Sequence, residues 1–180
     1  MVGTDMIKSG LKTSAFLLAA GALVVSSVSA QAQSQKPKEI RKHSDWGAYT
    51  YTDARAGKIC YILSVPQTKE PVDRDHGDVF FLVSQKPDGS AGFEPQVEVG
   101  YTLKAGEPVV ITVDGKTFNM FTKGKNAWLE NISEEPELVA AMRAGRTMKV
   151  TGQSGRGTQT TYTYSLSGVT AALKEVADCK

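Results

Sequence analysis

One short segment concentrates the side chains that could do chemistry. Three carboxylates and an imidazole stand together there, in the order Asp73, Arg74, Asp75, His76, Gly77 and Asp78. Carboxylate oxygens are the ligands that a hard cation such as Ca²⁺ prefers. However, the segment lacks the glutamate that ends an EF-hand loop, and Arg74 would repel a cation. We therefore expect a solvated loop whose Asp side chains make local turn hydrogen bonds. An enzyme site around His76 is the alternative.

No nucleophile stands beside a base in the sequence. Gly152-Gln153-Ser154-Gly155 lacks the spacing of a nucleophile elbow and is expected in a hairpin, not at a strand-to-helix turn. Cys60 has no neighbouring histidine, so a Cys–His enzyme would need His43 or His76 to approach it in space. Phosphate-binding and dinucleotide-binding glycine patterns are absent. The sequence therefore predicts a non-enzymatic protein with no catalytic, cofactor-binding or metal-binding residues.

Several aromatic side chains could stack on bases or sugars, namely Tyr49, Tyr51, Trp128, Tyr162 and Tyr164. Alternating aromatic residues in strands are more often core residues or cross-strand pairs. We expect that structural role here, with Trp128 in the core.

Alternation of apolar and polar residues predicts the strands that position these side chains. Such alternation runs through residues 46–51, 59–65, 79–83, 97–104, 109–113, 148–151 and 161–166. It is typical of a half-buried antiparallel sheet, because successive side chains point to opposite faces. Asp114-Gly115 is the strongest hairpin signal, Gly155–Gly157 and Ala56-Gly57 mark further hairpins, and residues 86–92 form another turn cluster.

Two segments have helical features. Residues 133–145 begin with Ser133 as a cap, carry Pro136 in the first turn and end at Gly145. The second segment is residues 170–178. Together with the preceding Val169 it has one apolar helical stripe, formed by Val169, Ala172, Leu173 and Val176. The chain is therefore predicted to be mainly β, a single compact antiparallel β-sandwich or partly open barrel of eight or nine strands, with one short internal helix and a C-terminal helix.

The first thirty residues have the three parts of a secretory signal peptide. Lys8 and Lys12 precede the apolar run 15–25, and small residues follow it. Eleven apolar residues are too few to span a bilayer. We expect cleavage after Ala30 or Ala32, a flexible polar lead-in over residues 31–44, and a β-rich domain over residues 45–180. No transmembrane segment is expected after cleavage.

Cys60 and Cys179 are the only cysteines in the sequence. Outside the cytosol they can oxidise, and we expect one disulfide between them within the chain. Two free thiols, or an intermolecular bridge through Cys179, are the alternatives. There is no C-x-x-C pair, so a metal or redox role is not indicated.

Composition restricts the class of partner. The 180 residues include 21 Lys and Arg against 19 Asp and Glu, and 41% are hydrophobic. This is the usage of one ordinary globular domain. The charge is too balanced for a protein that coats nucleic acid, so no nucleic-acid partner is expected.

Three features together resemble the invasion-associated locus B family. They are Trp46-Gly47-Ala48-Tyr49, the Cys60 strand that follows, and the ending 164–173 with the sequence YSLSGVTAAL. Residues 101–113 and 138–150 also resemble this family. Many members have further cysteines in the middle of the domain, where this chain has Phe118, Met120 and Phe121. The resemblance implies a virulence-associated envelope protein of alphaproteobacteria and carries over no catalytic residue.

These observations predict an exported protein of the periplasm or outer envelope, or a secreted one. We expect it to act by binding a protein or another envelope or host-surface component, without a cofactor. A small periplasmic enzyme with a site near His76 and an envelope stress or structural factor are the alternatives.

Overall fold

The computed structural model describes residues 36–54, 56–86, 92–177 and 179. The predicted signal peptide and residues 87–91 of the predicted turn cluster lie outside these residues. The described elements are β1 (Lys38–His43), β2 (Trp46–Asp53), β3 (Gly57–Ser64), β4 (Thr68–Glu70), β5 (Phe80–Gln85), β6 (Phe93–Glu98), β7 (Val109–Val113), β8 (Lys116–Lys123), β9 (Asn126–Leu129), a 3-10 turn (Ile132–Glu134), α1 (Glu135–Ala144), β10 (Thr147–Gln153), β11 (Gln159–Ser165) and α2 (Val169–Ala177).

The strands form one antiparallel sheet, which confirms the predicted mainly-β class. Its eleven strands run in the order β1-β2-β3-β5-β6-β9-β8-β7-β10-β11-β4, and the sheet is not closed into a barrel. The β7–β8 hairpin turns at Asp114 and Gly115, which both have positive φ (46° and 89°), as predicted. The sheet therefore has two free edges, at β1 and β4.

The sheet curls so that distant strands share one core on its inner face. Trp46 of β2 lies edge-on to Phe81 of β5, and Phe81 lies edge-on to Tyr164 of β11. The indole N–H of Trp46 donates to the backbone oxygen of Ser165 at 2.9 Å. Burial confirms the inward face of β11, which carries Tyr162 and Tyr164. In β3 the inward face carries Cys60, Ile62 and Ser64, whereas Val65 of the alternating apolar set 59–65 is exposed.

Two further expectations about the strands are wrong. β6 ends at Glu98 instead of continuing to residue 104, because Gly100 leaves the sheet to pack against Gly77. Trp128 is only half-buried, because β9 turns it to the outer face, where it stacks on Phe121 with ring centroids 5.8 Å apart. Alternation alone fixes neither the end of a strand nor which face becomes the core.

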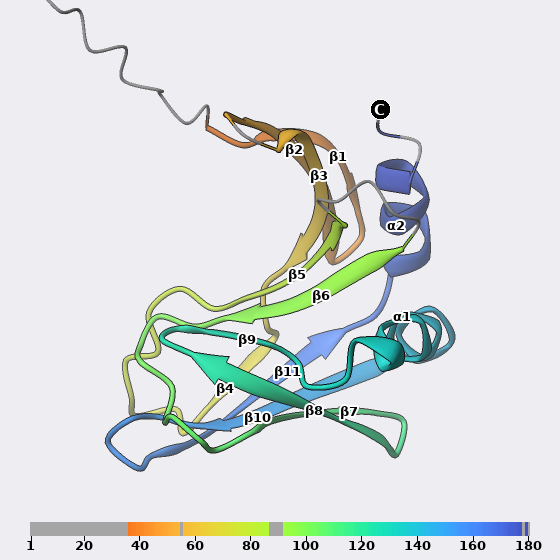
Figure 1. Ribbon diagram of the computed structural model, residues 1–180. Helices are drawn as coiled ribbons and strands as arrows, with labels where there is room; N and C mark the ends of the chain where they lie inside the picture. The colour runs from red at the N-terminus through yellow and green to blue at the C-terminus, as the bar shows by residue number, and fades with distance from the viewer. Residues whose placement is uncertain (1–35, 55, 87–91, 178, 180) are drawn as a thin grey trace, which may run out of the picture. The chain divides into compact units, whose positions relative to one another are not determined.

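Both predicted helices are present and pack on the same curled sheet (Figure 1). The apolar stripe of α2 is buried as predicted and packs on β1, β2, β3 and β5, while α1 packs on β6 and α2. The predicted cap of the internal helix is wrong. Asn131 is the capping residue of a preceding 3-10 turn, where its side-chain oxygen accepts from the backbone N–H of Ser133 at 3.1 Å.

The segment before α2 requires a glycine. Gly168 has a φ of +93°, and a Cβ at this position would overlap the backbone oxygen of His43. The neighbouring Ser167 oxygen accepts a hydrogen bond from the backbone N–H of Asp45 at 3.2 Å. The start of α2 is thus fixed against the turn between β1 and β2.

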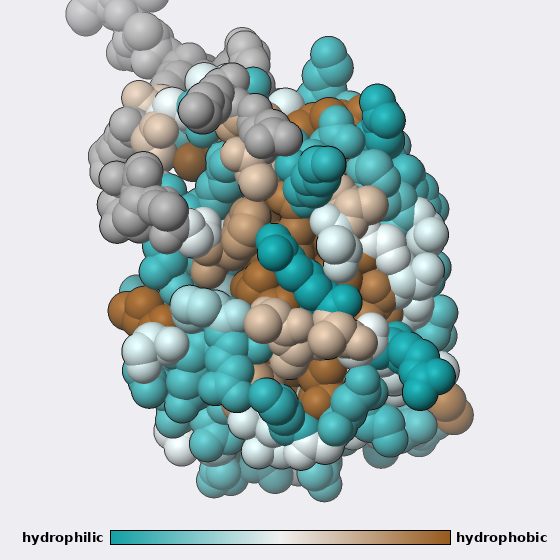
Figure 2. Space-filling model, turned by 90° about the vertical axis from the view of Figure 1, so that its right-hand side faces the viewer, coloured by the Kyte–Doolittle hydropathy of each residue, from teal (hydrophilic) through white to brown (hydrophobic). Residues whose placement is uncertain are grey.

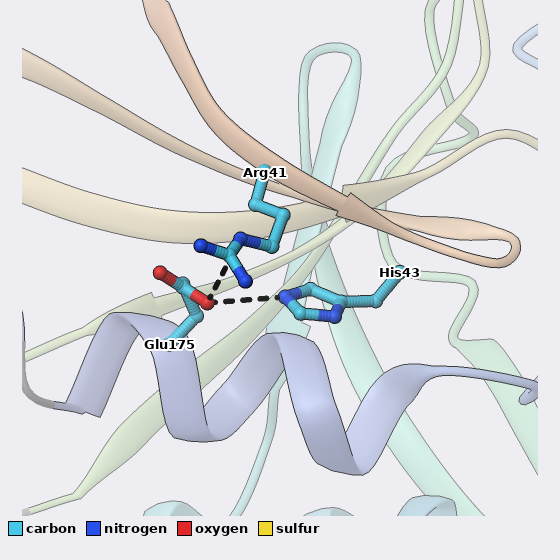
Figure 3. A network of polar contacts seen from close by, with 3 residues as sticks. All are labelled: Arg41, His43 and Glu175. Atoms are coloured by element: carbon cyan, nitrogen blue, oxygen red, sulfur yellow. Dashed lines mark hydrogen bonds and ion pairs between the residues drawn. The ribbon is translucent and has the colours of Figure 1, made fainter.

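Residues 38–43 form strand β1, although the sequence predicts a flexible lead-in over residues 31–44. Arg41 and His43 both reach Glu175 of α2, with N–O distances of 3.7 and 3.3 Å (Figure 3). Every residue from Lys38 to Lys42 is exposed, so no apolar period marks this strand in the sequence. Backbone pairing with β2 and these charged contacts hold it instead.

The predicted disulfide joins Cys60 of β3 to Cys179, just after α2, with Cα atoms 6.3 Å apart. It fastens the C-terminal helix to the strand on which it packs. No described helix is long and apolar enough to cross a membrane.

Candidate functional site: a polar cavity above His76

Three connections between strands meet around a polar cavity of about 610 Å³. They are the loop before β5, the connection from β6 to β7 and the β10–β11 hairpin, which lie at the end of the sheet away from the two helices (Figure 1). Loops on a rigid scaffold are where binding residues concentrate. The lining residues are Asp73, Arg74, Asp75, His76, Tyr101, Thr102, Ser154, Gly155, Arg156, Thr158 and Thr160.

His76 lies at the floor of this cavity and is only 5% exposed. Its Nε2 is 2.9 Å from the backbone oxygen of Pro71, and its Nδ1 is 2.9 Å from the hydroxyl of Tyr162. A carbonyl oxygen can only accept, so Nε2 carries a proton. Both ring nitrogens are therefore engaged within the protein, and neither is free to take a proton from a bound molecule.

The hydrogen bonds continue from Tyr162 toward the cavity wall. The hydroxyl of Tyr101 is 2.8 Å from that of Tyr162 and 2.6 Å from that of Thr160. Thr160 in turn donates to the backbone oxygen of Gly152 at 3.3 Å. Burial, and then the hydrogen bond and charge of Tyr101, raise the pKa of Tyr162 well above its ordinary value. Tyr162 therefore stays a neutral hydroxyl, and the four side chains form a fixed polar floor.

The loop that carries His76 is held by a close backbone contact. Gly77 has a φ of +58°, and a Cβ at Gly100 would meet the Cα of Gly77 at 2.6 Å. The Oδ1 of Asp75 accepts from the backbone N–H of Gly77 at 2.8 Å, and the Nζ of Lys69 donates to the Gly77 oxygen at 2.8 Å. Two glycines thus allow the loop and the β6–β7 connection to touch directly.

The rim of the cavity is charged and exposed. Arg74 pairs loosely with Asp73, with an N–O distance of 3.8 Å. Arg156, at the tip of the β10–β11 hairpin, makes no hydrogen bond or ion pair with the described residues. Its guanidinium is the cationic group at this rim that is free for a bound molecule.

The predicted solvated loop agrees with the structure for its aspartates but not for His76. Asp73 and Asp75 are exposed and line the cavity, with Asp75 making the expected turn hydrogen bond, whereas Asp78 is exposed and does not line it. His76 is buried rather than solvated, because Tyr162, 86 positions away, reaches it. In the described residues, no three His, Cys, Asp or Glu side chains are grouped to hold a metal ion.

Sequence reasoning missed Tyr101, Thr160 and Arg156 as members of this site. The alternation of residues 161–166 correctly places Tyr162 inside, but nothing local shows that it meets His76. A Cys–His site is excluded, because the sulfur of Cys60 lies in the disulfide and His43 binds Glu175.

Smaller hollows lie elsewhere on the described part of the molecule, and two of them border the tyrosines of the sheet and α1. One, of about 300 Å³, is on the outer sheet face beside Tyr51 and Tyr61. Tyr49 stacks on Tyr61 there, as a cross-strand pair with ring centroids 5.6 Å apart. The other, of about 370 Å³, borders α1. The ion pair of Lys86 and Glu135, 2.6 Å apart, lies in its wall.

Apolar residues also reach the surface on the side that carries the helices. In Figure 2, brown patches appear between teal ones in the middle of this side. Over the whole described part of the chain, and not on this side alone, the large apolar side chains that are exposed are Ile40, Val65, Val72, Phe121 and Ile132. They come from five different segments and do not build a site comparable to the cavity above His76.

Comparisons with known proteins agree with the observed fold. The crystal structure of invasion associated protein B from Bartonella henselae is similar, with a TM-score of 0.54 and 18% sequence identity, over 76% of this chain and 94% of that chain. At this identity the likeness concerns the fold alone. No curated protein matches the sequence. The family model described as invasion associated locus B (IalB) protein matches residues 46–177, and the chain belongs to this family.

Proposed function

We propose that this protein is exported and acts by binding a component of the cell envelope, without catalysing a reaction. The observation that carries the proposal is the cavity above His76, which has a fixed polar floor and a rim of exposed charged and hydroxyl groups. Its volume of about 610 Å³ falls within the range of about 300–1,000 Å³ that is usual for ligand sites.

Binding fits the floor of this cavity better than catalysis does. A general base needs a nitrogen or oxygen within hydrogen-bond reach of the proton that it removes. Both nitrogens of His76 already have partners within the protein. The hydrogen bonds of the floor can therefore persist while a molecule is bound above it.

Export is supported by the N-terminal sequence and by the cysteines. Residues 1–30 have the composition of a signal peptide. The Cys60–Cys179 disulfide is of a kind that persists in oxidising compartments such as the periplasm. An envelope location is also what the family resemblance implies.

Export is tested by expressing the full chain in a Gram-negative host, with a chain lacking residues 1–30 as the control. We expect the full chain in the periplasmic fraction, beginning at Gln31 or Gln33 by mass and without free thiols. The shortened chain should stay in the cytoplasm. Full-length material that keeps residues 1–30, or that stays in the cytoplasm, would contradict export.

Binding is tested by co-sedimentation of the purified oxidised protein with washed envelopes. We expect saturable binding that R156A weakens and R146A does not. Arg146 is the matched control, because it is an exposed arginine that immediately precedes β10, at the end of that strand opposite the cavity. Equal binding by both variants would show that the envelope component does not bind at the cavity. If the wild type did not bind at all, the proposed function itself would be contradicted.

A further inference from the structure

We propose that the cavity above His76 binds a neutral saccharide, an inference that rests on the proposed function and names its ligand class. The balance of charge in the lining gives the first argument. Two arginines, Arg74 and Arg156, face two aspartates, Asp73 and Asp75, so the formal charges cancel. Such a lining gives no net attraction to a strongly charged ligand, and each aspartate disfavours a phosphate.

The hydroxyl groups of the lining give the second argument. Thr102 and Thr158 make no side-chain hydrogen bond with the described residues, and Ser154 only accepts one, from the backbone N–H of Thr158 at 3.1 Å. A hydroxyl can both donate and accept. This dual ability complements the hydroxyls of a sugar, which also do both.

The arginine and the aspartates complete this pattern. A guanidinium presents several N–H groups in one plane, so Arg156 can donate to two adjacent sugar oxygens at once. One carboxylate oxygen of Asp75 accepts from the backbone N–H of Gly77, and the other can accept from a sugar hydroxyl. Donors and acceptors thus stand on both sides of one cavity.

Tyr101 provides the apolar part of the wall. It is half-buried and lines the cavity, while its hydroxyl is held by Tyr162 and Thr160. Its ring is therefore fixed in place before a ligand arrives. Aromatic rings have an apolar body that can pack on the C–H groups of a sugar ring, and a fixed ring lowers the entropic cost of binding.

The experiment is an NMR titration of the full oxidised chain with chitotriose and, separately, maltotriose, using inorganic phosphate as the anionic probe. We expect one of the two saccharides to shift the amides of residues 100–102 and 154–158 saturably, with phosphate leaving them unchanged. R156A should bind that saccharide about tenfold more weakly, the loss of a hydrogen bond to a charged group. R146A should bind it as the wild type does.

The inference is overturned if phosphate alone shifts these amides, if the saccharide shifts map to another surface, or if neither saccharide binds. The amide spectrum of R156A shows directly that this surface variant is folded. Envelope binding that persists and depends on Arg156 without saccharide binding would keep the proposed function and reject the ligand class. Loss of both would reject the two together.

Discussion

The hydroxyl of Tyr164 is buried without a hydrogen-bond partner among the described residues. Two positions earlier on the same face of β11, the hydroxyl of Tyr162 bonds to both His76 and Tyr101. A buried unsatisfied hydroxyl costs about 1–3 kcal/mol. We therefore expect Y164F to raise the free energy of unfolding in urea by about 1 kcal/mol. Y162F, the matched control, should lower it by about 1–3 kcal/mol.

The same pair of variants has a predictable pH dependence. Burial, followed by the charge of Tyr101, raises the pKa of Tyr164 above its ordinary value of 10.0. The folded state then holds this proton more tightly than the unfolded state does, so stability falls as the pH rises past about 10. Y164F should show a shallower fall than the wild type. A Y164F variant as unstable as Y162F would show that the Tyr164 hydroxyl has a partner.

His76 shows what sequence reasoning can and cannot reach at this scale. Residue types identified the segment 73–78 as the place where polar side chains gather, and the structure puts four of its residues at the cavity. The burial of His76 depends on Tyr162 and on contact between Gly77 and Gly100, which only the folded sheet brings together. No local pattern encodes those contacts.

At the scale of elements, the start of α2 depends on one glycine. Gly168 and Gly106 both have positive φ, +93° and +77°. A Cβ at Gly106 would meet nothing within 4 Å, whereas one at Gly168 would overlap the backbone oxygen of His43. We expect G106A to cost about 1–2 kcal/mol through backbone strain alone. G168A should cost clearly more, because β1 and α2 must also move apart.

Urea unfolding of the two variants measures this difference, and hydrogen exchange locates it. Amides of β1 and α2 should lose protection in G168A and keep it in G106A. Equal losses of stability in both variants, with protection of β1 unchanged, would show that backbone strain is the whole effect.

The sequence predicted the helices and strands in which buried side chains recur at the helical or strand spacing. α2 and most strands show it, since one face packs on the core. Strand β1 does not, because its residues from Lys38 to Lys42 are exposed on both faces. This strand is held by backbone pairing with β2 and by the contacts of its side chains with Glu175. Both are tertiary interactions, which a local sequence pattern does not show.

At the scale of the whole molecule, the disulfide determines how far the fold depends on its compartment. Cys60 and Cys179 are 119 positions apart, so their bond closes most of the described chain into one loop. In the chain-entropy model a loop of this length stabilises the folded state by about 4–5 kcal/mol. That is comparable to the lower end of the total stability of a domain, about 5 kcal/mol.

Reduction should therefore lower the urea midpoint of the wild type strongly. The double variant C60A/C179A should unfold near the midpoint of the reduced wild type and should not respond to dithiothreitol. The buried stripe of α2 remains in both, so the reduced protein should keep its sheet and unfold earlier rather than fail to fold. If dithiothreitol left the wild-type midpoint unchanged although mass mapping showed the bond broken, packing of α2 alone would hold the C-terminus. The fold would then be equally stable in a reducing cytoplasm, and the disulfide would no longer support export.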